Sequence, residues 1–306
     1  MKTGKKDSSW ISEQLCVQAA STCNIYCAYC QNPPDGKMPP LSRTLAAIKK
    51  RGITAVSLEG GGDPAANPDL FRLTAELRAA GVSRFMLSTN AVALADRKFC
   101  ARAVKEMDFF TVNFPSHLPE IYARATRSVK FHLALEGLEN LKACGAEGKL
   151  RLFHIVSAFN YRALPGFAAW AAKKFSGMAF ANLTFVRNAG RVENNPDLVP
   201  RYTAAAPFVK IALARFKLAG IKAVAQNLPL CQLRSFEGFS FEFQRWLRGD
   251  EVFEEGVAKG AASAACRGCG LRPACCGARA DYLRVYGAAE LSPSAKKPGA
   301  IRPEGF

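Results

Sequence analysis

The chain has 306 residues, of which 49% are hydrophobic and 22% are charged, and its formal net charge is +17. This length and composition exclude a small disulfide-rich secreted domain and allow one large hydrophobic core with a smaller appendage. Residues 1–10 are polar and Lys-rich, and no run of about 20 apolar residues occurs along the chain. We therefore expect a cytoplasmic protein without a membrane span.

Six short β-like segments alternate with helical patterns over the first 220 residues. They are 15–19, 55–58, 85–88, 110–113, 150–157 and 181–186. Ser42 and Gly52 bracket the first helix, and Asn67 is placed to cap the second. Six strand–helix units in sequence predict an α/β fold, a partial (β/α)6 TIM-like barrel with a parallel sheet. Functional residues should then directly follow the strands.

The strand–helix alternation ends near residue 220. A Phe-rich stretch, an Ala/Gly-rich link over 256–265 and a second group of cysteines follow it. We predict a barrel over 11–220, a small auxiliary-cluster module over 221–291 and a flexible tail over 292–306, because the tail is rich in Pro, Lys and Gly.

The net charge favours an anionic partner such as a nucleic acid, a phosphorylated metabolite or an acidic peptide. It does not choose among them, because the sequence has no compact Lys/Arg run of the kind expected for a nucleic-acid patch. A generally basic, Ala- and Arg-rich composition explains the charge equally well.

Eleven cysteines are present, and most of them fall into two groups. Three stand apart and are expected to be buried small apolar residues: Cys16, Cys100 and Cys144. The three histidines, which are never at ligand spacing, are expected to be structural or surface residues: His117, His132 and His154.

The first group, Cys23, Cys27 and Cys30, directly follows the first predicted strand. Three thiolates suit a cubane of four irons and leave one iron without a protein ligand, whereas four would close the cluster. An exogenous chelate can bind at that iron, and the amino and carboxylate groups of S-adenosylmethionine (AdoMet) are suited to it.

The second predicted strand is followed by Glu59 and then by Gly60-Gly61-Gly62-Asp63-Pro64. Consecutive glycines let the backbone approach a ligand without interference from a Cβ atom. A tight loop explains such a run equally well when it is taken alone. Its position after the second strand, as the cysteines follow the first, favours a ligand, so we expect Gly61 and Gly62 to present bare backbone to AdoMet.

The Cys-x3-Cys-x2-Cys run with Tyr29 before its last cysteine, followed by a glycine loop that ends in acid–Pro, resembles the radical AdoMet (radical SAM) superfamily. The resemblance extends over residues 11–220, with Asp63 where the family usually has Glu. It implies that Cys23, Cys27 and Cys30 ligate a catalytic [4Fe-4S] cluster. It also implies that the following residues bind AdoMet: Tyr29, Gly60, Gly61, Gly62, Asp63, Asn90, Asn113 and Ser157. Capping of the helix after a strand explains Asn90, Asn113 and Ser157 equally well.

The resemblance also implies an activity. An external reductant such as flavodoxin or ferredoxin supplies an electron, AdoMet is cleaved to methionine and a 5′-deoxyadenosyl radical, and the radical abstracts hydrogen from a substrate. Two other interpretations of the cysteines are a zinc site that joins Cys27-x2-Cys30 to Cys266-x2-Cys269 and a thiol redox pair. Neither explains Cys23 or the glycine loop.

The second group supplies four thiolates, the number that closes a second [4Fe-4S] cluster: Cys231, Cys266, Cys269 and Cys275. Their spacing resembles the Twitch or SPASM-like auxiliary-cluster module of radical SAM enzymes. Cys276 is the alternative to Cys275, and a zinc knuckle is the alternative to the cluster.

The module is similar to that of peptide- and protein-modifying maturases, so the first candidate substrate is a ribosomal peptide or protein side chain. A nucleotide, sugar or other anionic small molecule is the second candidate. A zinc or electron-transfer scaffold is the non-enzyme alternative, and it predicts no cleavage of AdoMet.

Overall fold

The computed structural model describes residues 14–249 and 264–304. Its contacts divide the chain into two compact units. Among the described residues, the first unit comprises 14–25, Asn32–Asn113 and Lys130–Leu150. The second comprises Tyr26–Gln31, Phe114–Val129, 151–249 and 264–304. The parts of the predicted barrel, link and tail that fall on 11–13, 250–263 and 305–306 lie outside the described residues.

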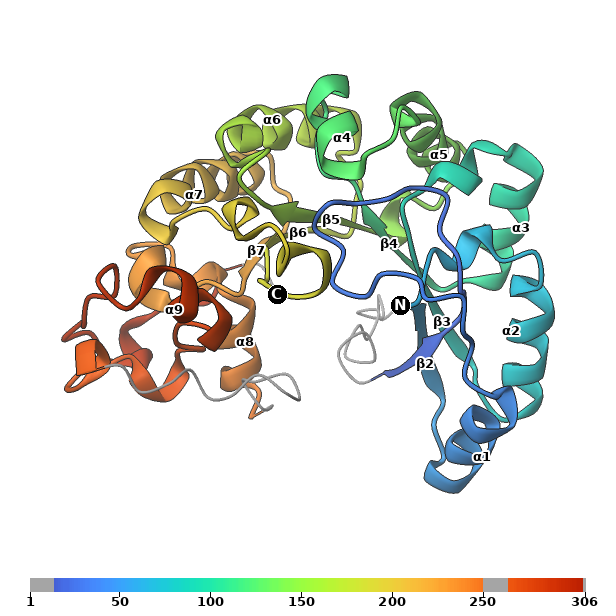
Figure 1. The fold of residues 1–306 in the computed structure, drawn as a ribbon, viewed down its shortest axis with the longest axis horizontal. Coiled ribbons are helices and arrows are strands. Elements are labelled where there is room, and N and C mark those ends of the chain that lie inside the picture. The colour runs from blue at the N-terminus through green and yellow to red at the C-terminus, as the bar shows by residue number, and fades with distance from the viewer. Residues whose placement is uncertain (1–13, 250–263, 305–306) are drawn as a thin grey trace, which may run out of the picture. The chain divides into compact units, whose positions relative to one another are not determined.

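The first unit contains four parallel strands that pair in chain order (Figure 1). The strands are β1 (Leu15–Gln18), β2 (Ala55–Glu59), β3 (Arg84–Thr89) and β4 (Phe109–Asn113). The helices are α1 (Leu41–Arg51), α2 (Leu70–Ala79), α3 (Arg97–Glu106) and α5 (Phe131–Ala143). Apolar strand residues such as Val56, Leu87 and Phe110 are fully buried, as expected of a parallel sheet that is covered on its faces.

The second unit contains three further parallel strands. They are β5 (Leu150–Val156), β6 (Phe180–Phe185) and β7 (Ala223–Gln226). The helices are α4 (Pro119–Thr126), α6 (Leu164–Lys174), α7 (Tyr202–Leu218), α8 (Phe241–Leu247) and α9 (Ala280–Tyr286). Every residue of β6 is buried, so this strand lies at the core of its unit.

The seven strands keep the order of the chain, from β1 to β7, in one sheet. This arrangement confirms the predicted α/β class of a partial (β/α) barrel, with seven strands in place of six. The six predicted strands are all present, whereas β7 was missed because it is only four residues long and half alanine, a residue with low strand propensity. No helix in the described part of the chain is long and apolar enough to cross a membrane.

The starts of two helices differ from the prediction. Helix α1 begins at Leu41, after Pro40, so Ser42 lies inside the helix and is not its cap. Helix α2 begins at Leu70, and the Asn67 side chain instead accepts a hydrogen bond from the Asp69 amide at 2.9 Å, two residues along the chain. Short polar side chains form such local turns as readily as they cap helices.

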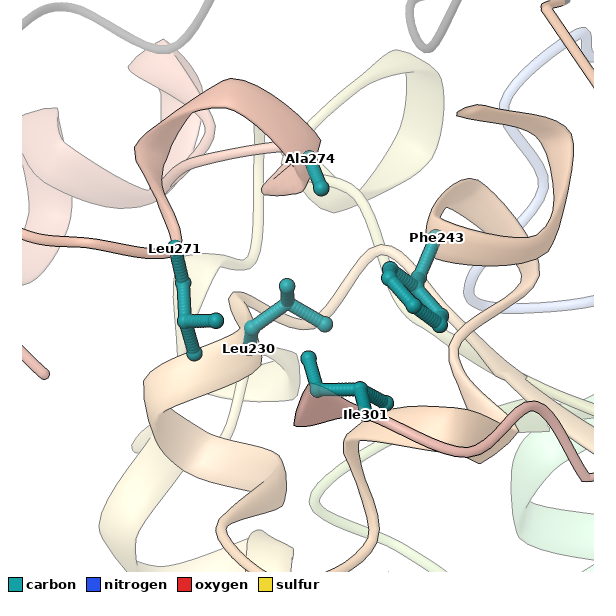
Figure 2. Close-up of a cluster of buried hydrophobic side chains, with 5 residues drawn as sticks. All are labelled: Leu230, Phe243, Leu271, Ala274 and Ile301. Atoms are coloured by element: carbon teal, nitrogen blue, oxygen red, sulfur yellow. The ribbon is translucent and has the colours of Figure 1, made fainter. Parts of the chain in front are cut away.

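The segment predicted to be a flexible tail is held by the rest of the second unit. Ile301 is buried in an apolar cluster, and Figure 2 shows its side chain pointing into the same space as those of Leu230 and Phe243. The Lys296 ammonium also pairs with the Glu237 carboxylate at 2.9 Å. Composition alone did not reveal that one isoleucine between prolines, lysines and glycines anchors this segment.

Candidate functional site

The glycine loop after β2 packs closely against the chain that leads to the cysteines. A Cβ atom on Gly61 would lie 2.5 Å from the Ala20 carbonyl oxygen, and one on Gly62 would lie 2.9 Å from the Thr22 amide nitrogen. A Cβ atom on Gly60 would meet no atom within 4 Å. Of these three glycines, Gly60 therefore faces open space, whereas the bare faces of Gly61 and Gly62 are covered by the chain itself.

Asp63 is buried and holds the end of this loop. Its carboxylate accepts hydrogen bonds from the Thr89 hydroxyl at 2.9 Å, the Asn90 amide at 2.8 Å and the Ala65 amide at 2.9 Å. Burial raises the pKa of Asp63, and these hydrogen bonds act in the opposite direction. The carboxylate thus ties the ends of β2 and β3 together inside the first unit.

Asn90, which follows β3, lies beside Cys23. Its side-chain nitrogen is 3.7 Å from the Cys23 sulfur and donates to the Asn24 side-chain oxygen at 2.7 Å. The Lys130 ammonium donates to the Asn24 carbonyl oxygen at 2.9 Å. Polar groups that follow β3 or begin α5 therefore fix the first cysteine of the motif within the first unit.

Cys27, Tyr29 and Cys30 belong to the second unit, in the loop Tyr26–Gln31. Cys27 and Tyr29 are buried, and Cys30 is half-buried. The loop is attached to the end of α4, because the amides of Tyr26 and Ala28 donate to carbonyl oxygens of that helix at 3.0 and 2.9 Å. Regular backbone hydrogen bonds thus hold this half of the cysteine motif.

The other predicted AdoMet contacts lie at strand ends. Asn113 is the last residue of β4, and Ser157 directly follows β5. The Ser157 amide and hydroxyl both hydrogen-bond to the Asn160 side-chain oxygen, at 2.8 and 3.4 Å. Ser157 is fully buried in this turn. Ser157 is thus held in a local turn by Asn160, the residue that precedes the short 3-10 helix Tyr161–Ala163.

A cavity of about 650 Å³ lies in the C-terminal part of the second unit. All the cysteines of the second group line it, together with leucines and prolines: Cys231, Cys266, Cys269, Cys275 and Cys276. The Leu230 and Gly277 amides donate to the Cys275 sulfur at 3.3 Å, and the Ser294 amide donates to the Cys269 sulfur at 3.4 Å. Backbone amides thus surround two of the sulfurs.

Adjacent cysteines in this cavity differ in acidity. Hydrogen bonding with the Cys276 thiol, together with the two backbone amides, lowers the pKa of Cys275 to about 7. The same thiol–thiol hydrogen bond and burial raise the pKa of Cys276.

Within residues 14–249 and 264–304, no group of three or more His, Cys, Asp or Glu side chains is arranged to hold a single metal ion.

A largely buried network of charges, which includes residues of this module, was missed in the sequence. Burial, and next the positive charge of Arg279, lower the pKa of Arg187 to about 10. The Arg279 side chain pairs with Asp281 at 2.9 Å, and its Nη1 atom is buried with no hydrogen-bond partner among the described residues. No motif revealed this network, because Arg187 is 92 residues from Arg279 in the chain.

The isolated cysteines are less uniform than predicted. Cys100 is buried, as expected, whereas Cys16 and Cys144 are exposed. Burial raises the pKa of Cys100 to about 12, and hydrogen bonding with the Cys144 thiol adds to the rise. Cys144 follows the last turn of α5, where a helix end meets solvent, so a small apolar side chain does not have to be buried there.

Together, the parallel strands in chain order define an open α/β barrel, in which the cysteine motif, the glycine loop and polar residues follow the strands. Residues 17–158 match the family model described as Radical SAM superfamily. This part of the chain, which is less than half of its length, is therefore similar to radical SAM domains. No curated protein matches the sequence.

Three solved structures illustrate the similarity of the fold. SuiB from Streptococcus suis is 12% identical with a TM-score of 0.51, over 69% of this chain and 48% of that one. The FeFe-hydrogenase maturase HydG from Carboxydothermus hydrogenoformans is 16% identical with a TM-score of 0.52, over 73% and 55%. anSMEcpe with bound AdoMet and Kp18Cys peptide is 16% identical with a TM-score of 0.57, over 81% and 68%. The chain thus spans about half the length of the first two, and these low identities establish the fold alone.

Proposed function

We propose that the protein uses reductive cleavage of AdoMet to modify a ribosomal peptide or a protein side chain. Cys23, Cys27 and Cys30 would hold a [4Fe-4S] cluster, and Gly60 would border the bound AdoMet. The observation that carries this assignment is that the segment leading to Cys23 follows β1 and packs against the glycine loop that follows β2. When bound, the cluster and AdoMet supply a 5′-deoxyadenosyl radical.

The residues around the first site fit such a group. The Asn90 side-chain nitrogen lies 3.7 Å from the Cys23 sulfur, and donors near cluster thiolates tune the reduction potential of the cluster. The open face of Gly60 leaves room for a ligand. Asp63 is already fully engaged with the chain, so its role is to hold the glycine loop and Asn90 in place. The amino group of AdoMet would then pair with backbone groups of the loop.

The C-terminal cavity favours a second [4Fe-4S] cluster held by Cys231, Cys266, Cys269 and Cys275. Four thiolates are the number that closes a [4Fe-4S] cluster, and a zinc knuckle with the same four ligands is the alternative. Iron is bound by thiolates. The two backbone amides that donate to the Cys275 sulfur favour its thiolate form, so we assign Cys275 and not Cys276 as the ligand. The module over 221–291 would thus adjoin a barrel over 11–220.

The peptide substrate is supported by the likeness to anSMEcpe, which was solved with a bound peptide. A second candidate, an anionic small molecule, is favoured by the net charge of +17 and by Arg279, whose Nη1 atom is buried without a hydrogen-bond partner among the described residues. An external reductant such as flavodoxin or ferredoxin would be the electron donor in both cases.

Deuterium transfer separates the two substrates. The reconstituted, reduced enzyme is given AdoMet with either a protease digest of perdeuterated protein or a mixture of perdeuterated nucleotides and sugar phosphates. Deuterium in 5′-deoxyadenosine from the peptide mixture supports the proposal. Deuterium from the anionic mixture alone would replace it with the second candidate.

A further inference from the structure

The loop after β6 contacts the cysteine loop directly, and both belong to the second unit. The Arg191 amide donates to the Cys30 carbonyl oxygen at 3.0 Å. Its guanidinium Nη1 donates to the Cys27 carbonyl oxygen, also at 3.0 Å. One residue therefore binds the main chain at both cysteines that Tyr26–Gln31 contributes to the motif.

The Arg191 guanidinium also covers an aromatic ring of the same loop. Its central carbon lies 3.2 Å from the centroid of the Tyr26 ring, which is 52% exposed. A guanidinium stacked on tyrosine gains cation–π energy and is held in one orientation. The charge is therefore fixed beside the cysteine loop and does not extend freely into solvent.

Gly190 allows this close approach. Its φ angle is +60°, and a Cβ atom would lie 2.6 Å from the Cys30 carbonyl oxygen. Only a residue without a side chain fits that backbone conformation and that distance. Gly190 and Arg191 thus form one contact, in which the glycine lets the arginine amide reach Cys30.

We propose that Arg191 is a positioning residue for the three-cysteine site, with two effects. It holds the loop so that Cys27 and Cys30 are presented for ligation before a cluster is bound. Its fixed positive charge also raises the reduction potential of the bound cluster, because a nearby cation favours the more negative, reduced state. The second effect depends on the proposed assignment of Cys23, Cys27 and Cys30 as ligands.

Two variants and one control test this inference. Arg191→Gln removes the charge and the guanidinium, and Arg191→Lys keeps the charge. Arg162→Gln is the control, because Arg162 is an exposed arginine of the same unit that also stacks on a tyrosine, Tyr161, at 4.5 Å. Circular dichroism and thermal unfolding of the metal-free proteins establish that all three variants are folded.

The first readout needs no cluster. In metal-free protein, mass spectrometry follows the rate at which iodoacetamide alkylates Cys27 and Cys30. We expect Arg191→Gln to raise both rates roughly tenfold, as the loss of one charge-assisted hydrogen bond and of the contact with the Tyr26 ring implies, and Arg162→Gln to leave them unchanged. Equal rates in Arg191→Gln and wild type would overturn the loop-holding role.

The second readout is the midpoint potential of the electron paramagnetic resonance signal that changes when AdoMet is added. It should be more negative in Arg191→Gln, close to wild type in Arg191→Lys and unchanged in Arg162→Gln. An unshifted potential in Arg191→Gln with a full signal would overturn the electrostatic role. A wild-type protein without such a signal would instead refute the proposed cluster, and the alkylation rates would still decide whether Arg191 holds the loop.

Discussion

The replacement Gly62→Ala tests how closely the glycine loop must approach the segment before Cys23. The added Cβ atom would collide with the backbone of Thr22, the residue next to that cysteine. The φ angle of Gly62 is +155°, where side chains are rarely found. The Asp63 amide also donates to the Thr22 carbonyl oxygen at 3.0 Å, and this hydrogen bond would be lost if the segments separated.

The expected magnitude follows from these three contributions. Overpacking costs about 1–3 kcal/mol, the strained backbone about 1–2 and the hydrogen bond about 1, so Gly62→Ala should lower the free energy of unfolding by about 3–6 kcal/mol. Gly60→Ala is the matched control, because its φ angle is +75° but its Cβ atom would meet nothing within 4 Å. Backbone strain alone predicts a loss of about 1–2 kcal/mol for Gly60→Ala.

Urea unfolding of the metal-free proteins, followed by circular dichroism, measures both values. Iron content after anaerobic reconstitution is the second readout, and it should fall in Gly62→Ala because the displaced segment carries Cys23. Gly60→Ala should keep its iron and instead weaken AdoMet binding. The reasoning is refuted if the two variants lose the same stability, because the close approach would then contribute nothing.

Three further predictions concern the cysteine cavity and a buried histidine. Cys275→Ser should reduce the iron content from about eight to about four atoms per chain, whereas Cys276→Ser should retain about eight; equal losses would refute the choice of Cys275. Cys231→Ala should leave AdoMet cleavage without substrate largely intact, and its loss with a full first cluster would contradict separate roles for the two clusters. Burial lowers the pKa of His154 from 6.5 to about 3. As the pH falls below 6.5, His154 is protonated in the unfolded state but stays neutral in the folded state, so acid favours unfolding. Between pH 6.5 and 5 the free energy of unfolding of metal-free wild type should therefore fall by roughly 2 kcal/mol more than that of His154→Gln. Parallel urea curves for the two proteins at both pH values would rule out this origin, and the exposed His132→Gln is the control.

The order of elements and the position of the motifs could be predicted from the sequence, because both depend on local signals. Alternating apolar runs and helical patterns identified six strands. The cysteine motif after the first strand can be recognised from residue spacing alone, without knowledge of tertiary contacts. The four residues of β7 have no such signal, and they are a strand because they pair with β6.

Long-range contacts could not be predicted. The covering of Gly61 by Ala20 depends on two loops that are 41 residues apart, and the position of Arg191 at Cys27 depends on residues that are 164 apart. Ile301 was assigned to a tail because its neighbours are polar or small, yet it fills a gap beside Leu230. Each of these features follows from side-chain packing that a single sequence does not encode locally.

Cleavage of AdoMet by the anaerobically reconstituted, dithionite-reduced protein tests the central claim most directly, since it requires no substrate. Chromatography of the products should show 5′-deoxyadenosine and methionine in wild type and neither in Cys27→Ala, the matched variant without one of the three thiols. Methylthioadenosine or S-adenosylhomocysteine as the main product would indicate a different reaction of AdoMet. No cleavage by wild-type protein that carries a full first cluster would contradict the account.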